Sequence, residues 1–305
     1  MASLREIRQR IKSVKNIAQI TRAMQMVAAS RMRRAQEQAL ASRAYAAKSW
    51  EILTHLAAQR GNTQQLHSLL TDRAEVKNVA ILLITSDKGL TGAYNGNVIR
   101  AVIRFMRSNN REGAHLITVG RKGRDFMIRF GRKVIAEFTN LPARPTTLDI
   151  APIARIAIDG FLAGEFDEVY LAYTDFINTL TQEPTIRLLL PIRPGTVESK
   201  VMSEYLGQET TMSTAEYIYE PDPETLLDTI LPRFTELQIY QAFLEARASE
   251  ESARMVAMRN ATENANELID DLSLVYNKAR QDAITKELLD IAGGAEAMAQ
   301  ARVAG

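Results

Sequence analysis

The two ends of the chain lack helix-breaking residues over unusual lengths. Neither glycine nor proline occurs from Met1 to Arg60 or from Arg233 to Ala292. At 1.5 Å rise per residue, each stretch can form a helix about 90 Å long. Helices in globular domains average about a dozen residues. These lengths therefore predict a coiled coil or a long two-helix rod.

A heptad pattern supports the coiled coil. In the first stretch the alternation of three and four residues runs through Leu4, Ile7, Ile11, Val14, Ala18, Thr21, Gln25, Ala28, Met32, Ala35, Ala39 and Ser42. Near the other end it runs through Ala261, Ala265, Leu268, Leu272, Val275 and Ala279. Such spacing forms the seam of a left-handed supercoil. The first seam becomes small and polar after Val14, and such side chains bury little area, so we expect the first helix to pair with the last and to depend on its surroundings.

The middle of the chain alternates apolar runs, which we interpret as strands, with helical stretches. The expected strands are Asn78–Thr85, Ala114–Gly120, Lys133–Phe138, Glu168–Thr174 and Thr185–Ile192. The expected helices are Val98–Arg107, Lys122–Phe130 and Leu148–Leu162. Alternation of this kind is typical of a mostly parallel sheet covered by helices. The sequence therefore predicts an α/β fold: an antiparallel coiled coil of long N- and C-terminal helices plus a Rossmann-like, mostly parallel α/β domain.

Local signals mark the borders of these parts. We expect a coiled-coil helix at 1–60, the Rossmann-like domain at 76–221 and a second coiled-coil helix at 222–305. Arg193–Thr211 is a polar connection, and Ala215–Pro221 is a candidate edge strand. The last helix is expected to open at Asp222–Glu224, with an aspartate N-cap, a proline in the first helical position and an acid in the first turn. Pro232 is expected to kink or locally break it.

The segment SDKGLTGAYNGN, Ser86–Asn97, lies where a phosphate-binding loop would follow the first strand. Gly89, Gly92 and Gly96 are spaced G-x-x-G-x-x-x-G, which fits neither the dinucleotide-binding fingerprint nor the P-loop. Lys88 precedes the glycines instead of closing the loop. A nucleotide-binding enzyme stays as an alternative, but glycines that permit positive φ in a turn explain the pattern better.

Other catalytic chemistry has little support in the sequence. The chain has no cysteine, which excludes disulfides and thiolate chemistry. His55, His67 and His115 are scattered without metal-ligand spacing. Asp270 and Asp271 are adjacent and so point about 100 degrees apart on a helix. We expect no catalytic, cofactor or metal site and no direct small-molecule substrate.

Charge is distributed unevenly, although the net charge is only +2. From Met1 to Arg34, Glu6 is the single acid among the basic residues Arg5, Arg8, Arg10, Lys12, Lys15, Arg22, Arg31, Arg33 and Arg34. Binding to nucleic acid is one explanation, but the charges lie around the helix and few aromatics accompany them. An acidic protein surface lining a channel, or a solvated coiled-coil flank, explains the same residues.

The sequence also has no run of about 18 apolar residues and no signal-peptide pattern. We therefore expect a cytoplasmic protein unless a partner holds it at a membrane. A pair of long helices that carries an α/β domain, with no credible active site, would transmit position or force, or hold partners together.

Four segments carry a family resemblance: Leu4–Gln36, the loop SDKGLTG, the helix entry YEPDPETLLDTILPRF, and Ala253–Ala297. They resemble the gamma subunit family of F-type ATP synthase, the central stalk, in its bacterial form without the regulatory cysteine insertion. The resemblance covers nearly the whole chain in order. Thr91 stands where many members carry cysteine, which indicates that only a small residue is required there.

The resemblance implies a rotor shaft without a catalytic site. The paired helices would run along the axis of a hexamer of alpha and beta subunits, and the α/β domain would meet the epsilon subunit and the membrane c-ring at the cytoplasmic face of the bacterial cell membrane. Rotation of the ring by proton flow would drive ATP synthesis in the beta subunits. Carried over by motif, contacts with the stator are expected at Arg22, Met24, Lys88, Arg280, Gln281 and Thr285. Leu288–Ala299 would occupy an apolar sleeve; for each residue, an ordinary coiled-coil flank is the alternative.

Overall fold

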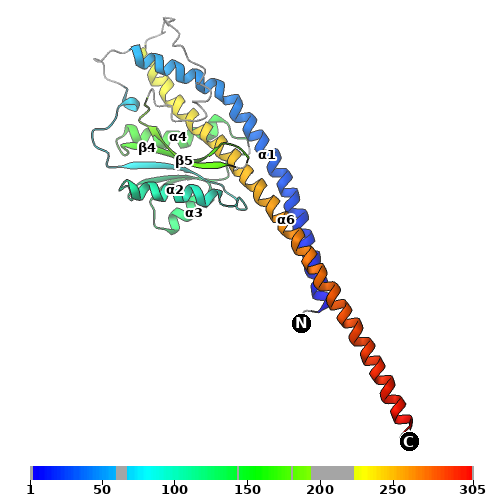
Figure 1. Cartoon of the computed structure of the whole chain (residues 1–305). Helices are drawn as coiled ribbons and strands as arrows, with labels where there is room; N and C mark the ends of the chain where they lie inside the picture. Colours follow the sequence, from blue (N-terminus) through cyan, green and yellow to red (C-terminus); the bar gives the residue numbers. More distant parts are fainter. Residues whose placement is uncertain (1–2, 60–66, 143, 180, 194–222, 304–305) are drawn as a thin grey trace. The chain divides into compact units, whose positions relative to one another are not determined.

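The computed structural model describes residues 3–59, 67–142, 144–179, 181–193 and 223–303 (Figure 1). Its elements in chain order are α1 (Leu4–Gln59), the 3-10 helix η1 (Ser68–Leu70), β1 (Val79–Ile84), α2 (Tyr94–Ser108), β2 (His115–Val119), α3 (Arg121–Arg129), β3 (Val134–Phe138), α4 (Thr147–Leu162), β4 (Glu168–Phe176), β5 (Gln182–Leu190) and α6 (Pro223–Val303). They form two compact units, one of Met1–Val27 with Met255–Gly305 and the other of Ala28–Arg254. Helices α1 and α6 contribute to both units.

In the first unit, α1 and α6 run antiparallel. Arg8 Nη2 donates to Tyr276 Oη at 2.6 Å, and the hydroxyls of Thr21 and Thr262 lie 2.7 Å apart. A higher number on α1 thus meets a lower number on α6. The guanidinium of Arg8 also lies 5.5 Å from the centroid of the Tyr276 ring. The predicted antiparallel pairing of the first and last helices is confirmed.

The seam predicted for α1 is the buried face of that helix. Its fully buried members are Ile7, Ala18, Thr21, Ala28, Met32, Ala35 and Ala39. The seam predicted for α6 needs correction, because Leu268 and Val275 are 47% and 53% exposed while their neighbours Ile269 and Tyr276 are half-buried. Ala265 is buried as expected. Two adjacent apolar residues fit a heptad almost equally well, so sequence periodicity alone picked the wrong one.

The second unit contains a five-stranded sheet in the order β3-β2-β1-β4-β5. The strands β1 to β4 pair in parallel, and β5 pairs antiparallel to β4. Helices α2, α3 and α4 connect the parallel strands, as the alternating pattern predicted. This is the mostly parallel α/β architecture expected from the sequence.

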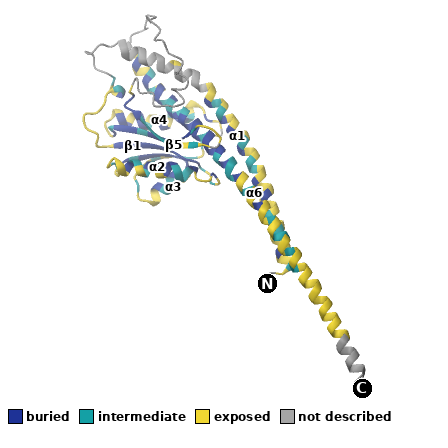
Figure 2. Ribbon diagram, viewed as in Figure 1, coloured by how far each residue is buried: buried dark blue, intermediate teal, exposed yellow. Residues whose placement is uncertain are grey.

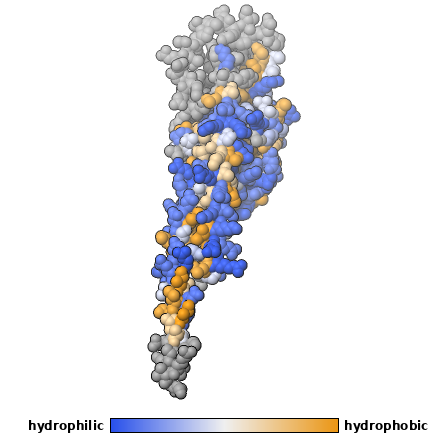
Figure 3. Space-filling view, turned by 90° about the vertical axis from the view of Figure 1, so that its right-hand side faces the viewer, coloured by the Kyte–Doolittle hydropathy of each residue, from blue (hydrophilic) through white to orange (hydrophobic). Residues whose placement is uncertain are grey.

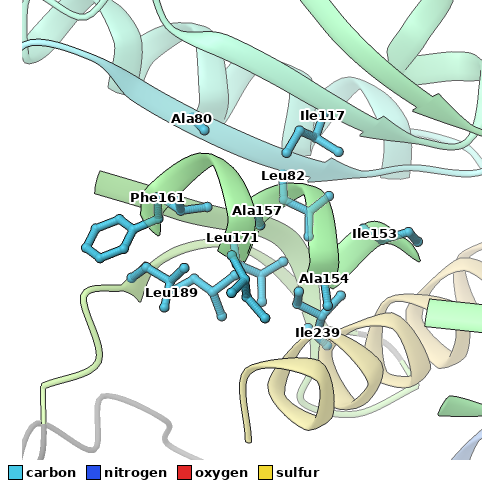
Figure 4. Close-up of a cluster of buried hydrophobic side chains, with 14 of the residues drawn as sticks. Ala80, Leu82, Ile117, Ile153, Ala154, Ala157, Phe161, Leu171, Leu189 and Ile239 are labelled. Carbon is cyan, nitrogen blue, oxygen red and sulfur yellow. The ribbon is translucent and has the colours of Figure 1, made fainter. Parts of the chain in front are cut away.

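The three inner strands β1, β2 and β4 are buried on both faces and are mostly apolar (Figure 2), whereas β3 and β5 at the edges are only partly buried. On one face, Leu82 of β1 and Leu171 of β4 pack with Phe161 of α4 and Ile239 of α6 (Figure 4). On the other face, β1 packs against α2 and α3 through Val79, Ile81, Leu83, Val98, Val102, Met106 and Met127. Removing apolar side chains from water on both faces is the main stabilising contribution to this unit.

Several local predictions meet a different outcome. Helix α2 begins at Tyr94, inside the glycine-rich segment, instead of at Val98. The expected break at Pro232 is wrong, since α6 continues through it. Buried Leu231 and Phe234 anchor that turn in the core, which offsets the missing backbone donor of proline. The candidate strand Ala215–Pro221, the N-cap at Asp222 and the connection after Arg193 lie outside the described residues.

Candidate functional site

The segment Ser86–Asn97 uses its own polar groups to hold its shape. Asn95 Oδ1 accepts from Ser86 N at 3.0 Å, and Asn95 Nδ2 donates to Ser86 Oγ at 2.7 Å and Thr91 Oγ1 at 3.1 Å. Ser86 Oγ donates to the carbonyl oxygen of Lys88 at 2.6 Å. Thr91 is buried in this network, so a small side chain is what the position requires. This network holds Ser86, Thr91 and Asn95 together at the start of α2.

The glycines of this segment do not share one role. Positive φ values occur at Gly92 (54°) and at the non-glycine residue Leu90 (65°). Gly96 lies in helix α2, and neither Gly89 nor Gly96 has a φ in the left-handed range. Of the three glycines, Gly92 is thus a turn glycine with positive φ and Gly96 lies in the first turn of a helix.

A small hollow lies at the carboxyl ends of β1 and β2, where α/β proteins commonly bind ligands. Asp87 closes it from the loop side, because its carboxylate accepts from Arg121 N at 3.2 Å and Asn140 N at 3.0 Å. The hollow is lined by residues that include Tyr94, Arg247 and Glu250 and has a volume of about 10 Å³. That is room for about one water molecule. The geometry does not fit a nucleotide.

The expected contact residues on the coiled-coil unit are accessible. Arg22 is exposed and Met24 half-buried on α1, and Arg280, Gln281 and Thr285 are all exposed on α6. Gln281 and Thr285 lie four residues apart and share a helix face. In the other unit, Lys88 is exposed on its loop. Within the described part of the chain, none of the three basic residues of this set forms an ion pair.

Helix α6 exposes large apolar side chains in the first unit. Leu274, Leu288, Leu289 and Ile291 are 70%, 62%, 67% and 64% exposed. Apolar side chains gather along this part of α6 in Figure 3, just before its grey end. Every described side chain from Arg280 to Ala295 is exposed. A continuous apolar surface of this kind marks an interaction site.

A buried cluster of charged residues in the second unit escaped the sequence analysis. Arg254 Nη2 lies 2.5 Å from Glu250 Oε1, and Arg254 Nη1 lies 2.7 Å from Glu251 Oε2. Arg247 also pairs with Glu250 at 3.3 Å, and Arg31 of α1 approaches Glu251 at 3.7 Å. Glu250, Glu251 and Arg254 are all nearly inaccessible to solvent. The i,i+3 and i,i+4 spacing of acids and arginines was the available signal.

This buried cluster borders the hollow and affects its neighbours. Burial lowers the pKa of Arg254, but the charges of and hydrogen bonds to Glu250 and Glu251 outweigh it and leave the pKa raised. Burial, with the negative charge of Glu250, raises the pKa of Tyr94. The Tyr94 hydroxyl donates to the carbonyl oxygen of Ala246 at 3.0 Å, which fixes α2 against α6. These ionised groups stabilise the fold, because each one faces a partner of opposite charge within the cluster.

Across the part of the chain that the structure describes, no helix is long and apolar enough to span a bilayer. Nor do the described histidine and carboxylate side chains gather anywhere in a group of three or more that could hold a metal ion.

The chain was compared with known proteins and solved structures. The ATP synthase family model matches residues 3–298. The ATP synthase gamma chains of Dehalococcoides mccartyi strain CBDB1 and Roseiflexus castenholzii are each 49% identical to it, and the matches cover 98% of this chain and 100% of each relative. A central stalk and c-ring structure of Tetrahymena thermophila mitochondrial ATP synthase matches with 28% identity and a TM-score of 0.58 over 79% of this chain and 99% of that chain. The Euglena gracilis OSCP/F1/c-ring structure shares the fold, with a TM-score of 0.65 at 19% identity over 97% and 94% of the two chains.

A family model that spans nearly the whole chain agrees with full-length relatives of one kind. The four sequence segments and the paired terminal helices agree with them as well. The chain belongs to the ATP synthase gamma-chain family.

Proposed function

We propose that this chain is the central rotor shaft of an F-type ATP synthase. It couples proton flow through a membrane ring to ATP synthesis in a hexamer of alpha and beta subunits by rotating within that hexamer. The observation that carries the proposal is the antiparallel α1–α6 pair with a small-residue seam and exposed apolar side chains on α6. A helix pair with such a surface needs a surrounding partner.

The chain has no catalytic or cofactor site of its own in this proposal. The hollow of about 10 Å³ beside the loop Ser86–Asn97 supports this, because it has no room for a nucleotide. ATP is then synthesised in the beta subunits. As this chain rotates, each beta subunit in turn meets a differently shaped side of it. Its other partners are the epsilon subunit and the membrane c-ring, and it lies peripherally at the cytoplasmic face of the bacterial membrane.

The stator contacts are assigned to Arg22, Met24, Lys88, Arg280, Gln281 and Thr285. All are exposed except Met24, which is half-buried. Basic side chains without an internal partner suit a shaft that must meet several acidic surfaces in turn, because long-range attraction does not lock it in one position. The apolar side chains after Thr285 would enter the sleeve of the hexamer.

Reconstitution tests the proposed function. The purified chain is added to alpha and beta subunits from Roseiflexus castenholzii, whose own gamma chain is 49% identical, and ATP hydrolysis is measured. We expect the chain to enter the hexamer and raise hydrolysis severalfold. A chain that neither co-purifies with the hexamer nor changes its activity contradicts the proposal.

Charge reversal at a proposed contact gives a sharper prediction. Arg280→Glu places an acid where an acidic stator surface is expected. Because like charges at an interface cost several kcal/mol, we expect the concentration for half-maximal stimulation to rise by at least roughly tenfold. Arg155→Glu is the matched control, since Arg155 is an exposed arginine on α4. Equal effects of the two substitutions would show that Arg280 is not a specific contact.

A further inference from the structure

The outer layer formed by α2, α3 and the segments around them is strongly basic. From Tyr94 to Lys133 the acids are Glu112 and Asp125, and the basic residues are Arg100, Arg104, Arg107, Arg111, Arg121, Lys122, Arg124, Arg129, Arg132 and Lys133. The chain as a whole is nearly neutral, with a net charge of +2. This surplus of positive charge is therefore a local property of one layer.

The fold turns five of these basic side chains away from the sheet. Helices α2 and α3 cover the same sheet face through the cluster that contains Val102 and Met127. At about 100 degrees per residue, the positions opposite these core residues face solvent. On α2 they are Arg100, Arg104 and Arg107, and on α3 they are Lys122 and Arg129. All five are exposed and together form what we call the basic face.

The nearby acids are already engaged elsewhere. Asp125 forms an ion pair with Arg124 at 2.8 Å, and Glu112 forms one with Arg132 at 4.0 Å. Glu168 forms an ion pair with Arg111 at 2.8 Å. Among the residues that the structure describes, no member of the basic face forms an ion pair. Five uncompensated cations in one layer produce a field that attracts an anionic surface.

Exposed apolar side chains adjoin the basic face. Ile128 and Phe130, at the end of α3, are 56% and 61% exposed. The Phe130 ring stacks on Phe126 at 4.4 Å between centroids, so it is held in place at the surface. Arg129 lies between the two in sequence and Arg132 follows. Cationic side chains beside exposed aromatic and aliphatic groups are typical of surfaces that lie at a bilayer interface.

We propose that the basic face binds the anionic phospholipid headgroups of a membrane surface, with Phe130 at the level of the headgroups. Phosphate groups neutralise the five cations, while Ile128 and Phe130 leave water. A nucleic acid would satisfy the cations equally well, but it has no use for the aliphatic side chain of Ile128. An acidic protein surface would need an apolar patch of its own to cover Ile128 and Phe130, and binding to protein-free anionic vesicles separates these two occupants. The proposal depends on the α/β unit alone and not on the proposed rotor function.

Vesicle binding of the full chain tests the proposal. Large unilamellar vesicles of phosphatidylglycerol and phosphatidylcholine are compared with vesicles of phosphatidylcholine alone by co-sedimentation. Each basic residue near an anionic bilayer strengthens binding on the order of fivefold. The triple variant Arg104→Gln, Arg107→Gln and Arg129→Gln is therefore expected to bind about 100-fold more weakly. Equal binding of the two vesicle types by the unmodified chain would overturn the proposal.

A matched variant separates the basic face from net charge. Arg5→Gln, Arg10→Gln and Lys12→Gln remove the same charge from exposed positions of α1. We expect this variant to keep most of the vesicle binding, and a loss as large as that of the first variant would overturn the assignment to α2 and α3. Duplex DNA is titrated at the same salt concentration. Tighter binding to the duplex than to anionic vesicles, with the same dependence on the three arginines, would likewise overturn the choice of lipid.

Insertion of the aromatic side chain is measured separately. Trp50 is the single tryptophan of the chain, so the variant Trp50→Phe with Phe130→Trp reports from the end of α3. Its tryptophan fluorescence is expected to shift to the blue with anionic vesicles and to stay unchanged with phosphatidylcholine. Binding of this variant to anionic vesicles without a blue shift would contradict the placement of residue 130 at the headgroups. Reconstitution with the hexamer does not enter any of these measurements, so either proposal can fail alone.

Discussion

Replacement of Arg254 with alanine is expected to lower the free energy of unfolding by about 3–5 kcal/mol. The substitution removes the guanidinium that lies 2.5 Å from Glu250 and 2.7 Å from Glu251. Both carboxylates are nearly inaccessible to solvent, so they would remain buried with only the more distant Arg247 and Arg31 to neutralise them. Urea unfolding of the full chain, followed by circular dichroism, measures the change.

Arg259→Ala is the matched control for this prediction. Arg259 is on the same helix and pairs with Glu263 at i,i+4 spacing, but the two side chains are 67% and 56% exposed. An exposed pair contributes about 0.3–0.5 kcal/mol, so the two arginine variants should differ by severalfold in effect. A similar loss of unfolding free energy in both variants would mean that burial does not strengthen the interactions between the charges of the cluster. The variant Arg254→Met, which keeps the apolar stem, separates the lost charge from the lost packing.

Replacement of Gly120 with alanine is expected to lower the free energy of unfolding by about 4 kcal/mol, from backbone strain and overpacking of about 1–3 kcal/mol each. Gly120 has φ 95°, and an added Cβ would lie 2.2 Å from the carbonyl oxygen of Thr85. The backbone oxygen cannot move away, because β1 and β2 are paired beside it and Thr85 N donates to Val119 O at 2.8 Å. The same urea titration gives the measurement.

Gly113→Ala controls for the general effect of losing a glycine. No heavy atom lies within 4 Å of its added Cβ, and its φ is outside the left-handed range. Alanine lowers the conformational entropy of the unfolded chain. We therefore expect this substitution to be neutral or to stabilise the fold slightly, by up to about 1 kcal/mol. If Gly120→Ala matched this control, the close approach of β1 and β2 at Thr85 would be more adaptable than the structure indicates.

The architecture could be predicted from the sequence because its determinants are local. A strand buried on both faces must be apolar throughout, so β1 appears in the sequence as the run Val79–Ile84. Two stretches without glycine or proline become α1 and α6. The seam of α1 was correct, although the apolar Ile17 and Val27 stand next to the buried Ala18 and Ala28. The seam of α6 was not, because Leu268 and Ile269 compete for the same place and only the partner helix decides between them.

The charged groups of the fold were harder to predict, since their pairing is a matter of tertiary structure. Glu250, Glu251 and Arg254 look like a solvated helix face in the sequence, because charged residues are seldom fully buried without partners. The partner Arg31 is on α1, more than 200 residues earlier in the chain. The glycine spacing of the loop at Ser86–Asn97 predicts a poor phosphate cradle, and that stays a prediction. Its positive φ at Leu90, however, follows from the network around Asn95 and Thr91.

The exposed end of α6 also bears on how this protein must be produced in the cell. From Arg280 to Ala295 every described side chain faces solvent, including Ile284, Leu288, Leu289 and Ile291. A free copy would present that surface to other copies and to the protein quality-control machinery. If partner subunits cover α6 as proposed, synthesis of this chain is expected to be matched to theirs, and any surplus to be bound by chaperones or degraded by proteases.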